Sequence, residues 1–127
     1  MNYLPFEHLY NIELTLREAE IKLRIGLPCT VRNNEADLIE YDFDKYIFRF
    51  DMEGNLSEVT ADCKVLEYKS QKITFKELSK FISVNDIQAF EKYGFIVSPK
   101  YGVAFDPEFE PWVTFLTHSG LSGWKNV

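Results

Sequence analysis

The stretch from Asp37 to Tyr68 alternates apolar and polar residues, and this pattern constrains the fold more than any other part of the chain. Successive side chains of a β-strand leave opposite faces, so a period of two residues indicates strands. The apolar phase shifts at Asp44-Lys45, and Glu53-Gly54-Asn55 is typical of a turn. The stretch therefore predicts an antiparallel meander of three strands, with no helix between residues 46 and 65.

The two faces of this meander are predicted to differ in their contact with solvent. Aromatic and aliphatic residues share one face, and acidic residues gather on the other. We expect the apolar face to be buried, with Tyr41, Phe48, Phe50 and Val59 in the core. We expect the acidic face to be exposed, with Glu40, Asp42 and Asp62 in solvent.

Helix signals flank the meander. Thr15 and Glu18 have the spacing of a capping box, which predicts a helix over Leu16–Ile25 that ends before Gly26. Thr74 and Glu77 repeat this spacing at the start of a second helix. The segment 83–86 is expected to interrupt that helix and to cap a short third one, which ends at Gly94.

Further strands are predicted before and after these helices. Residues 29–34 form the first, and 95–97, 102–105 and 112–116 form the last ones. Residues 1–14 fit both a strand pattern and a helical stripe. A chain of 127 residues is one ordinary domain. We therefore predict a single α+β domain over residues 1–127, mainly an antiparallel sheet with helices packed on one face.

Composition favours a soluble protein of a reducing compartment. No apolar run approaches the roughly 18 residues needed to span a bilayer, and the first residues show no export signal. We therefore expect a cytoplasmic protein without membrane contact. Cys29 and Cys63 are far apart in sequence and form no CxxC pair, so we expect buried thiols and neither a disulfide nor a metal site.

Acidic residues are concentrated in one part of the chain. Residues 35–58 hold eight acidic and two basic residues, a local charge of −6 that equals the formal net charge of the whole chain. This concentration disfavours nucleic acid as a ligand and suits a basic protein partner, although a merely solvated face would have the same pattern. The candidate partner-binding residues in this region are Asp37, Glu40, Asp42, Asp44, Asp51 and Glu53.

A second candidate surface is the loop 106–112. It contains Asp106, Glu108 and Glu110, each next to a proline, together with Phe109 and Trp112. Aromatic side chains on a braced loop are good interface anchors, because little conformational entropy is lost on binding. Trp112 could equally begin a core strand.

The sequence offers no catalytic or metal-binding motif. His8 and His118 are the two histidines, and the glycine-rich segment after His118 does not match a nucleophile elbow, so we interpret it as a mobile tail. Residues 51–55 lack the ligand alternation of a calcium loop. We therefore expect no catalytic residue, no metal and no cofactor.

The run from Tyr93 to Pro107, continued by Pro111 to Leu116, resembles segments of bacterial immunity proteins from contact-dependent inhibition and related polymorphic-toxin systems. This resemblance implies a small non-enzymatic protein that neutralises a cognate toxin, such as a nuclease. Separately, the segments 23–28 and 51–56 are similar to the helix-then-meander layout of small bacterial envelope-assembly domains, but no lipoprotein signal accompanies them.

From these observations we predict an immunity protein that covers the active site of a basic toxin with its acidic and aromatic surface. The alternatives are a small-molecule-binding module or small enzyme, with a pocket between sheet and helices, and an interaction module of an unrelated assembly. The sequence leaves the oligomeric state open.

Overall fold

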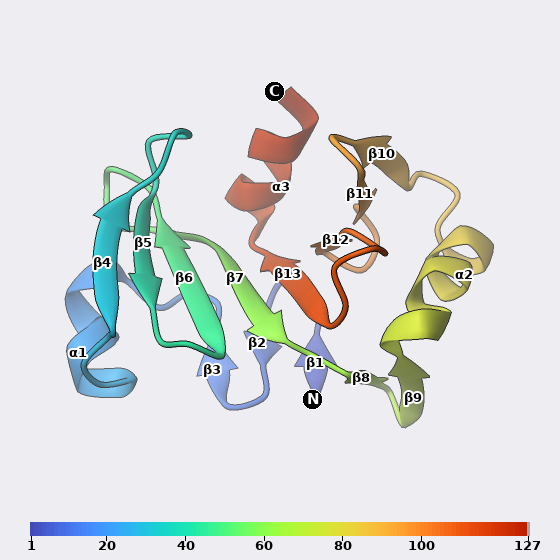
Figure 1. Ribbon diagram of the computed structural model, residues 1–127, viewed down its shortest axis with the longest axis horizontal. Helices are drawn as coiled ribbons and strands as arrows, with labels where there is room; N and C mark the ends of the chain where they lie inside the picture. Colours follow the sequence, from blue (N-terminus) through green and yellow to red (C-terminus); the bar gives the residue numbers. More distant parts are fainter. Residues whose placement is uncertain (127) are drawn as a thin grey trace.

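The structure is a computed structural model, and it describes residues 1–126. Its helical elements are the 3-10 helix η1 (Glu18–Glu20) and the α-helices α1 (Ile21–Arg24), α2 (Phe75–Asn85) and α3 (His118–Asn126). Its strands are β1 (Tyr3–Leu4), β2 (His8–Leu9), β3 (Ile12–Glu13), β4 (Thr30–Asn33), β5 (Ile39–Asp42), β6 (Tyr46–Phe50), β7 (Leu56–Asp62), β8 (Val65–Tyr68), β9 (Gln71–Thr74), β10 (Phe90–Lys92), β11 (Phe95–Ser98), β12 (Val103–Phe105) and β13 (Trp112–Leu116). Figure 1 shows how they are arranged.

One eight-stranded sheet dominates the molecule, in the order β10-β11-β12-β13-β7-β6-β5-β4, and every neighbouring pair in it is antiparallel. The predicted meander is confirmed as β5, β6 and β7, and residues 46–65 contain no helix. Its turns use the residues that the sequence indicates, because Asp44 and Gly54 both have positive φ (76° and 84°). Pairing of β13 with β7 joins the meander to the C-terminal strands.

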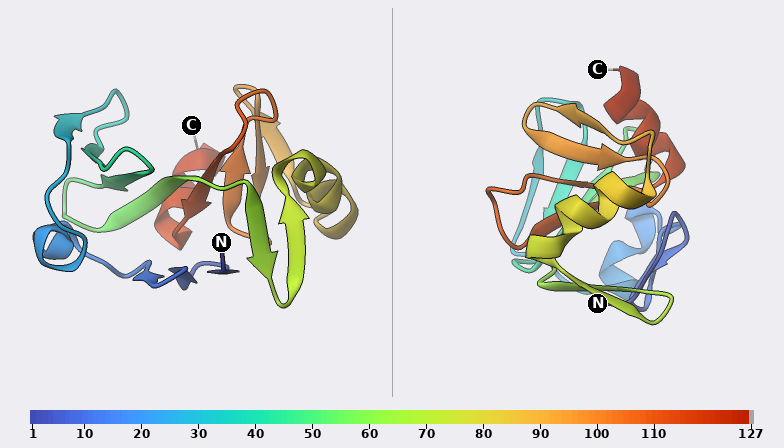
Figure 2. Two further views of the ribbon diagram at one scale, coloured as in Figure 1. Left: turned by 60° about the horizontal axis from the view of Figure 1, so that its bottom comes forward. Right: turned by 90° about the vertical axis from the view of Figure 1, so that its right-hand side faces the viewer.

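The apolar face of the meander is the centre of the core. Phe48, Phe50 and Val59 are fully buried, as predicted, whereas Tyr41 is half-buried with its ring edge against Phe50. The N-terminal strands cover this face, and the ring of Tyr3 lies 4.7 Å from that of Phe115 on β13. Figures 1 and 2 show these strands on one side of β7 and β13, with α3 on the other side.

The helices do not share one face of the sheet, contrary to the prediction. α3 lies over β7 and β13, whereas α2 follows the β8–β9 hairpin at one end of the molecule (Figures 1 and 2). The predicted capping box of α2 is confirmed, because Thr74 Oγ1 accepts the Glu77 amide and the Glu77 carboxylate accepts the Thr74 amide (3.3 and 3.2 Å). Phe75 anchors the helix against Phe105 (5.9 Å between ring centroids).

The predicted helix over Leu16–Ile25 is shortened to η1 and α1. Glu18 does not cap Thr15: its amide donates to the Gly54 carbonyl (3.0 Å) and its carboxylate accepts the Tyr41 hydroxyl (2.8 Å). The Glu20 carboxylate instead accepts the amide of Arg17 (3.1 Å). The local cap is therefore shifted from Thr15 and Glu18 to Arg17 and Glu20, while Glu18 contacts the β6–β7 turn and β5.

The predicted short helix after residue 86 is wrong. α2 continues to Asn85, and the buried Asp86 carboxylate accepts the Ser98 hydroxyl and the Lys100 amide (2.6 and 3.1 Å). Ile87 is 95% exposed, and the chain then enters β10. Asp86 thus fastens the end of α2 to β11 and does not start a new helix.

The C-terminal segment is the helix α3, so the expectation of a mobile tail is wrong. Thr117 Oγ1 accepts the Gly120 amide at 3.1 Å and donates to the Ser57 carbonyl at 2.9 Å.

The strands expected at 29–34, 95–97, 102–105 and 112–116 are all present. Of the cysteines, Cys63 is buried as expected, but Cys29 is exposed, and both are free thiols. Within the described part of the chain, no helix is long and apolar enough to cross a membrane.

Candidate functional site: a charged ladder beneath an aromatic groove

Strands β4 to β7 place side chains of alternating charge opposite one another on the polar face of the sheet. Arg32 pairs with Glu40, Glu40 with Arg49, and Arg49 with Glu58 in the strand register. Directly opposed residues on one face have Cβ atoms about 4.5–5.5 Å apart, which is close enough for ion pairs. We call these residues the charged ladder.

The ladder is connected by short hydrogen bonds. Arg32 Nε and Arg49 Nε donate to the two oxygens of Glu40, each at 2.7 Å. Arg49 Nη1 donates to Glu58 Oε2 at 2.9 Å and to Thr60 Oγ1 at 2.7 Å. No buried side-chain nitrogen or oxygen in residues 1–126 lacks a partner. The charges on this face are therefore compensated within the protein.

Glu40 corrects the prediction of an exposed acidic face, because it is only 5% exposed. Burial raises the pKa of its carboxyl, but the hydrogen bonds from Arg49 and Arg32 outweigh burial and bring the pKa to about 2. The same contact raises the pKa of Arg32. Asp42 and Asp62 are half-buried and not fully exposed as expected. Glu40 is buried because it has a basic partner on each neighbouring strand.

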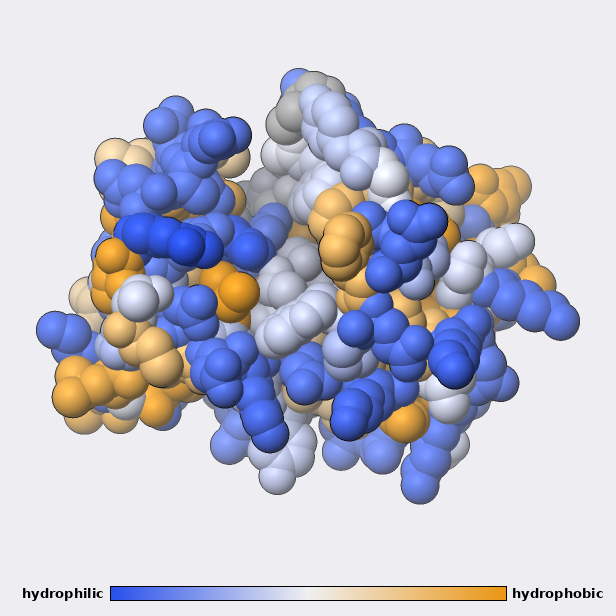
Figure 3. Space-filling view, in the orientation of Figure 1, coloured by the Kyte–Doolittle hydropathy of each residue, from blue (hydrophilic) through white to orange (hydrophobic). Residues whose placement is uncertain are grey.

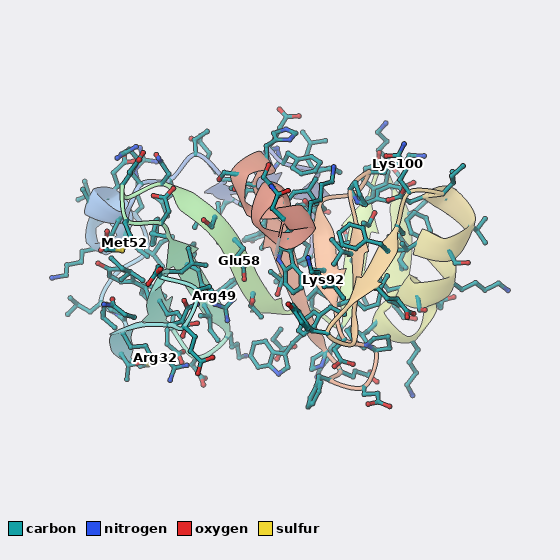
Figure 4. All side chains as sticks on the ribbon, turned by 90° about the horizontal axis from the view of Figure 1, so that it is seen from above. Arg32, Arg49, Met52, Glu58, Lys92 and Lys100 are labelled. Atoms are coloured by element: carbon teal, nitrogen blue, oxygen red, sulfur yellow. The ribbon has the colours of Figure 1, made fainter. Side chains whose placement is uncertain are left out.

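The helix α3 lies over the inner end of the ladder. Its Gly120 approaches β7 so closely that a Cβ there would lie 2.0 Å from the Ser57 carbonyl oxygen. Trp124 Nε1 donates to Glu58 Oε1 at 3.2 Å, and Lys92 Nζ donates to the Trp124 carbonyl at 2.7 Å. Figure 4 shows Arg49 and Glu58 pointing toward each other beside α3, with Lys92 on the far side of the helix.

Two open cavities flank Trp124 and share the Arg49–Glu58 pair in their linings, and together we call them the aromatic groove. The first, about 350 Å³, extends toward the β4–β5 loop. The second, about 300 Å³, extends toward the loop 106–112. Figure 3 shows this side of the molecule as a hollow between the strands β4 to β6 and the C-terminal half.

The loop 106–112 forms one wall of the groove. Asp106 Oδ1 accepts the Glu108 amide (2.9 Å), and the Trp112 amide donates to the Phe109 carbonyl (3.0 Å), which fixes the turn. Phe109 is 65% exposed. Trp112 is 36% exposed even though it is the first residue of β13, because alternation turns it to the groove and turns Val113 to the core. The structure thus brings Asp106, Phe109 and Trp112 to one cavity.

The acidic residues of the meander do not form one patch. Asp42 accepts the Asp44 amide (2.8 Å) in the β5–β6 turn, whereas Asp51 accepts the Glu53 amide (2.9 Å) in the β6–β7 turn. These turns lie at opposite ends of β6, and exposed Asp37 lies at the β6–β7 end, before β5. Several of these carboxylates build turns, a role that aspartate commonly has.

The charged ladder was not predicted, although the sequence contains a signal for it. In the predicted meander the turn is at Asp44-Lys45, and Glu40 lies four residues before Asp44 while Arg49 lies four residues after Lys45. An antiparallel pairing about this turn therefore places Glu40 opposite Arg49. Counting charges along the chain concealed this pairing, because it grouped Glu40 with its sequence neighbours and not with Arg49.

Other candidate chemistry is sparse. Within residues 1–126, no group of three or more His, Cys, Asp or Glu side chains could hold a metal ion. His118 begins α3 and stacks on Phe6, with ring centroids 4.0 Å apart. Burial raises the pKa of the Cys63 thiol to about 11, which makes this cysteine a poor nucleophile at neutral pH.

No known protein family, curated protein or solved structure matches this chain.

Proposed function

We propose that this protein is a non-enzymatic binding protein that docks a protein partner on the rim of the aromatic groove. The observation that carries the proposal is the exposure of Phe109 and Trp112 on a hydrogen-bonded loop. Large aromatic side chains that are exposed yet conformationally restricted contribute strongly to interfaces. Asp106, Glu108 and Glu110 lie on the same loop, so the rim suits a basic partner.

The charges beneath the groove favour binding over catalysis. Arg49 is held by Glu40, Glu58 and Thr60, so it is committed to the protein's own side chains. A general acid or base needs a pKa near the working pH, and the pKa of Glu40 is about 2. The ladder therefore acts in this proposal as a rigid floor.

We infer further that the partner is a toxin domain and that this protein is its immunity protein. Two features support this inference: the resemblance of residues 93–107 and 111–116 to immunity proteins, and the net charge of −6, which would steer a basic toxin toward it. Docking would cover the toxin's active site, with the exposed acids Asp37, Asp44 and Glu53 contributing to attraction over a distance and Phe109 anchoring the complex.

A small-molecule-binding module is the second candidate. The cavities of about 350 and 300 Å³ favour it, since ligand sites usually begin near 300 Å³. Both cavities are open, however, and their central charged pair is already satisfied internally. A small molecule would have to bind without displacing the Arg49–Glu58 contact.

Co-expression tests the toxin-immunity proposal. The C-terminal domain of a large secreted protein encoded by a neighbouring gene is produced in bacterial cells, alone or together with this chain. We expect the domain to arrest growth and the chain to restore it, whereas the Phe109→Ala variant restores growth poorly. A matched control is Tyr10→Ala, which removes a similarly exposed aromatic residue (60%, against 65% for Phe109) that lines neither cavity of the groove. If the chain neither rescues growth nor binds the purified domain, the immunity assignment is refuted for that toxin.

A further inference from the structure

The cavity beside the loop 106–112 combines aromatic walls with acidic groups. Its volume is about 300 Å³, and we call it the aromatic cavity. Its walls include aromatic side chains from three parts of the chain: Phe95 of β11, Phe109 and Trp112 of the loop, and Trp124 of α3. Phe95 and Trp124 brace each other, with ring centroids 5.2 Å apart.

The charged side chains at this cavity differ in whether they already have partners within the protein. Arg49 donates to Glu40, Glu58 and Thr60, and Glu58 also accepts the Trp124 indole N–H, so this ion pair is committed to the protein's own groups. The Asp106 carboxylate, in contrast, uses Oδ1 for the Glu108 amide, and its Oδ2 has no hydrogen-bond donor in the described part of the chain. The ligand that complements this cavity is therefore a cation.

We propose that the aromatic cavity binds an arginine side chain of the protein partner. The proposal rests on the proposed binding function and specifies what the groove recognises. A guanidinium group stacks on tryptophan faces and keeps its in-plane N–H groups for carboxylates, a combination that neither an acidic nor an apolar side chain can match. Asp106 supplies the carboxylate, and Trp112 and Trp124 supply the aromatic side chains of the wall.

Arginine fits this cavity better than lysine for a geometric reason. The cavity is open, so the ligand must be held by contacts on its sides and not by enclosure. A planar guanidinium offers two faces and an edge, whereas an ammonium group is a compact, strongly hydrated charge. The guanidinium can thus lie between aromatic faces with its edge directed at Asp106.

The chain allows a direct test, because it has two tryptophans and both line the aromatic cavity. We would titrate the protein with acetyl-Gly-Arg-Gly-amide and follow tryptophan fluorescence together with the indole N–H signals in ¹⁵N NMR spectra. The matched probe is the same peptide with citrulline, which has the shape of arginine without its charge. We expect the arginine peptide to bind about tenfold more tightly than the citrulline peptide.

Matched variants locate the site. Asp106→Asn removes the charge while its side-chain oxygen can still accept the Glu108 amide, and Asp44→Asn removes an equal charge from an exposed turn outside the cavity. We expect Asp106→Asn to abolish most of the preference for arginine and Asp44→Asn to leave it unchanged. Equal binding of the two peptides, or an unchanged preference in folded Asp106→Asn, would overturn the proposal.

The outcomes separate this inference from the proposed function. A toxin domain that binds with full affinity to Asp106→Asn, but weakly to Phe109→Ala, would support the docking surface and refute the arginine site. A clear arginine preference in the peptide assay, together with no protein partner at this rim, would refute the proposed function alone.

Discussion

The side chains on the two faces of the meander are buried by different kinds of interaction. On one face Phe48, Phe50 and Val59 are fully buried by apolar contacts. On the other face the side chains of Glu40 and Arg49 are also largely buried, 7% and 18% exposed, but by charge pairing across strands. Alternation in the sequence assigns residues to the two faces correctly, but it does not predict which face is shielded from solvent.

The difference has an energetic consequence. An apolar core loses stability in proportion to the volume removed, because each lost atom costs transfer energy and leaves a cavity. A charged ladder costs the folded state little stability while every member is paired. Removing one member destabilises the protein, because its partner is left desolvated and unpaired. The substitutions below test this distinction, from the largest expected effect to the smallest.

Phe48→Ala empties the centre of the apolar face. We expect the free energy of unfolding to fall by about 3–5 kcal/mol, because Phe48 is fully buried. Urea unfolding followed by circular dichroism measures this loss. Phe109→Ala is the control, with an expected change within about 0.5 kcal/mol, since the side chain is 65% exposed. A loss below about 1 kcal/mol for Phe48→Ala would show that the apolar face is not the main core.

Glu40→Ala removes the member of the ladder that binds two arginines. We expect a loss of about 2–3 kcal/mol, smaller than for Phe48 because Arg49 keeps Glu58 and Thr60 as partners. Glu40→Gln is the matched variant: it keeps an acceptor for one arginine and should cost less. Unchanged stability in Glu40→Ala would mean that the ladder is solvated and contributes nothing.

Gly120→Ala tests how closely α3 packs on the polar face. A Cβ at Gly120 would meet the Ser57 carbonyl oxygen, so we expect α3 to shift and stability to fall by about 1–2 kcal/mol. Gly123→Ala on the same helix is the control, because its Cβ would meet no atom within 4 Å. Alanine there should be neutral or stabilise the helix by up to about 1 kcal/mol. Equal thermal unfolding of both variants would contradict the close approach.

The ladder should also make stability depend on pH. The pKa of Glu40 is lowered from 4.5 to about 2 in the folded protein, so its contribution is complete above about pH 5 and disappears as the pH falls toward 2. The difference in unfolding free energy between the wild type and Glu40→Gln should therefore shrink on acidification. A difference that stays constant from pH 7 to about pH 2.5 would show that Glu40 does not titrate as the paired residue described above.

Much of the fold follows from local sequence signals. Alternation predicted β5 to β7, and the Thr74–Glu77 capping box predicted the start of α2, because both features depend on neighbours in sequence. The missed helix α3 depends on distant residues: Gly120 packs on Ser57, and Trp124 bonds to Glu58. Its two glycines lower its intrinsic helix propensity, so only tertiary contacts explain it.

The candidate site was predictable in part for the same reason. The prolines and acids of the loop 106–112 are close in sequence, so they favoured exposure of Phe109, whereas the sequence left Trp112 open between the surface and the core; both are exposed. Glu40 was placed in solvent because its partners Arg32 and Arg49 lie on other strands. Trp124 was not recognised at all, since its place in the groove depends on how α3 packs.

The central claim is that the charged ladder is a framework and the groove rim is the binding surface. Calorimetric titration of Glu40→Gln and Phe109→Ala with the toxin domain used in co-expression tests this directly. We predict that Glu40→Gln unfolds more easily but binds with wild-type affinity while folded. Phe109→Ala should keep its stability and lose about tenfold or more in affinity. Weakened binding by folded Glu40→Gln, together with wild-type binding by Phe109→Ala, would contradict the account.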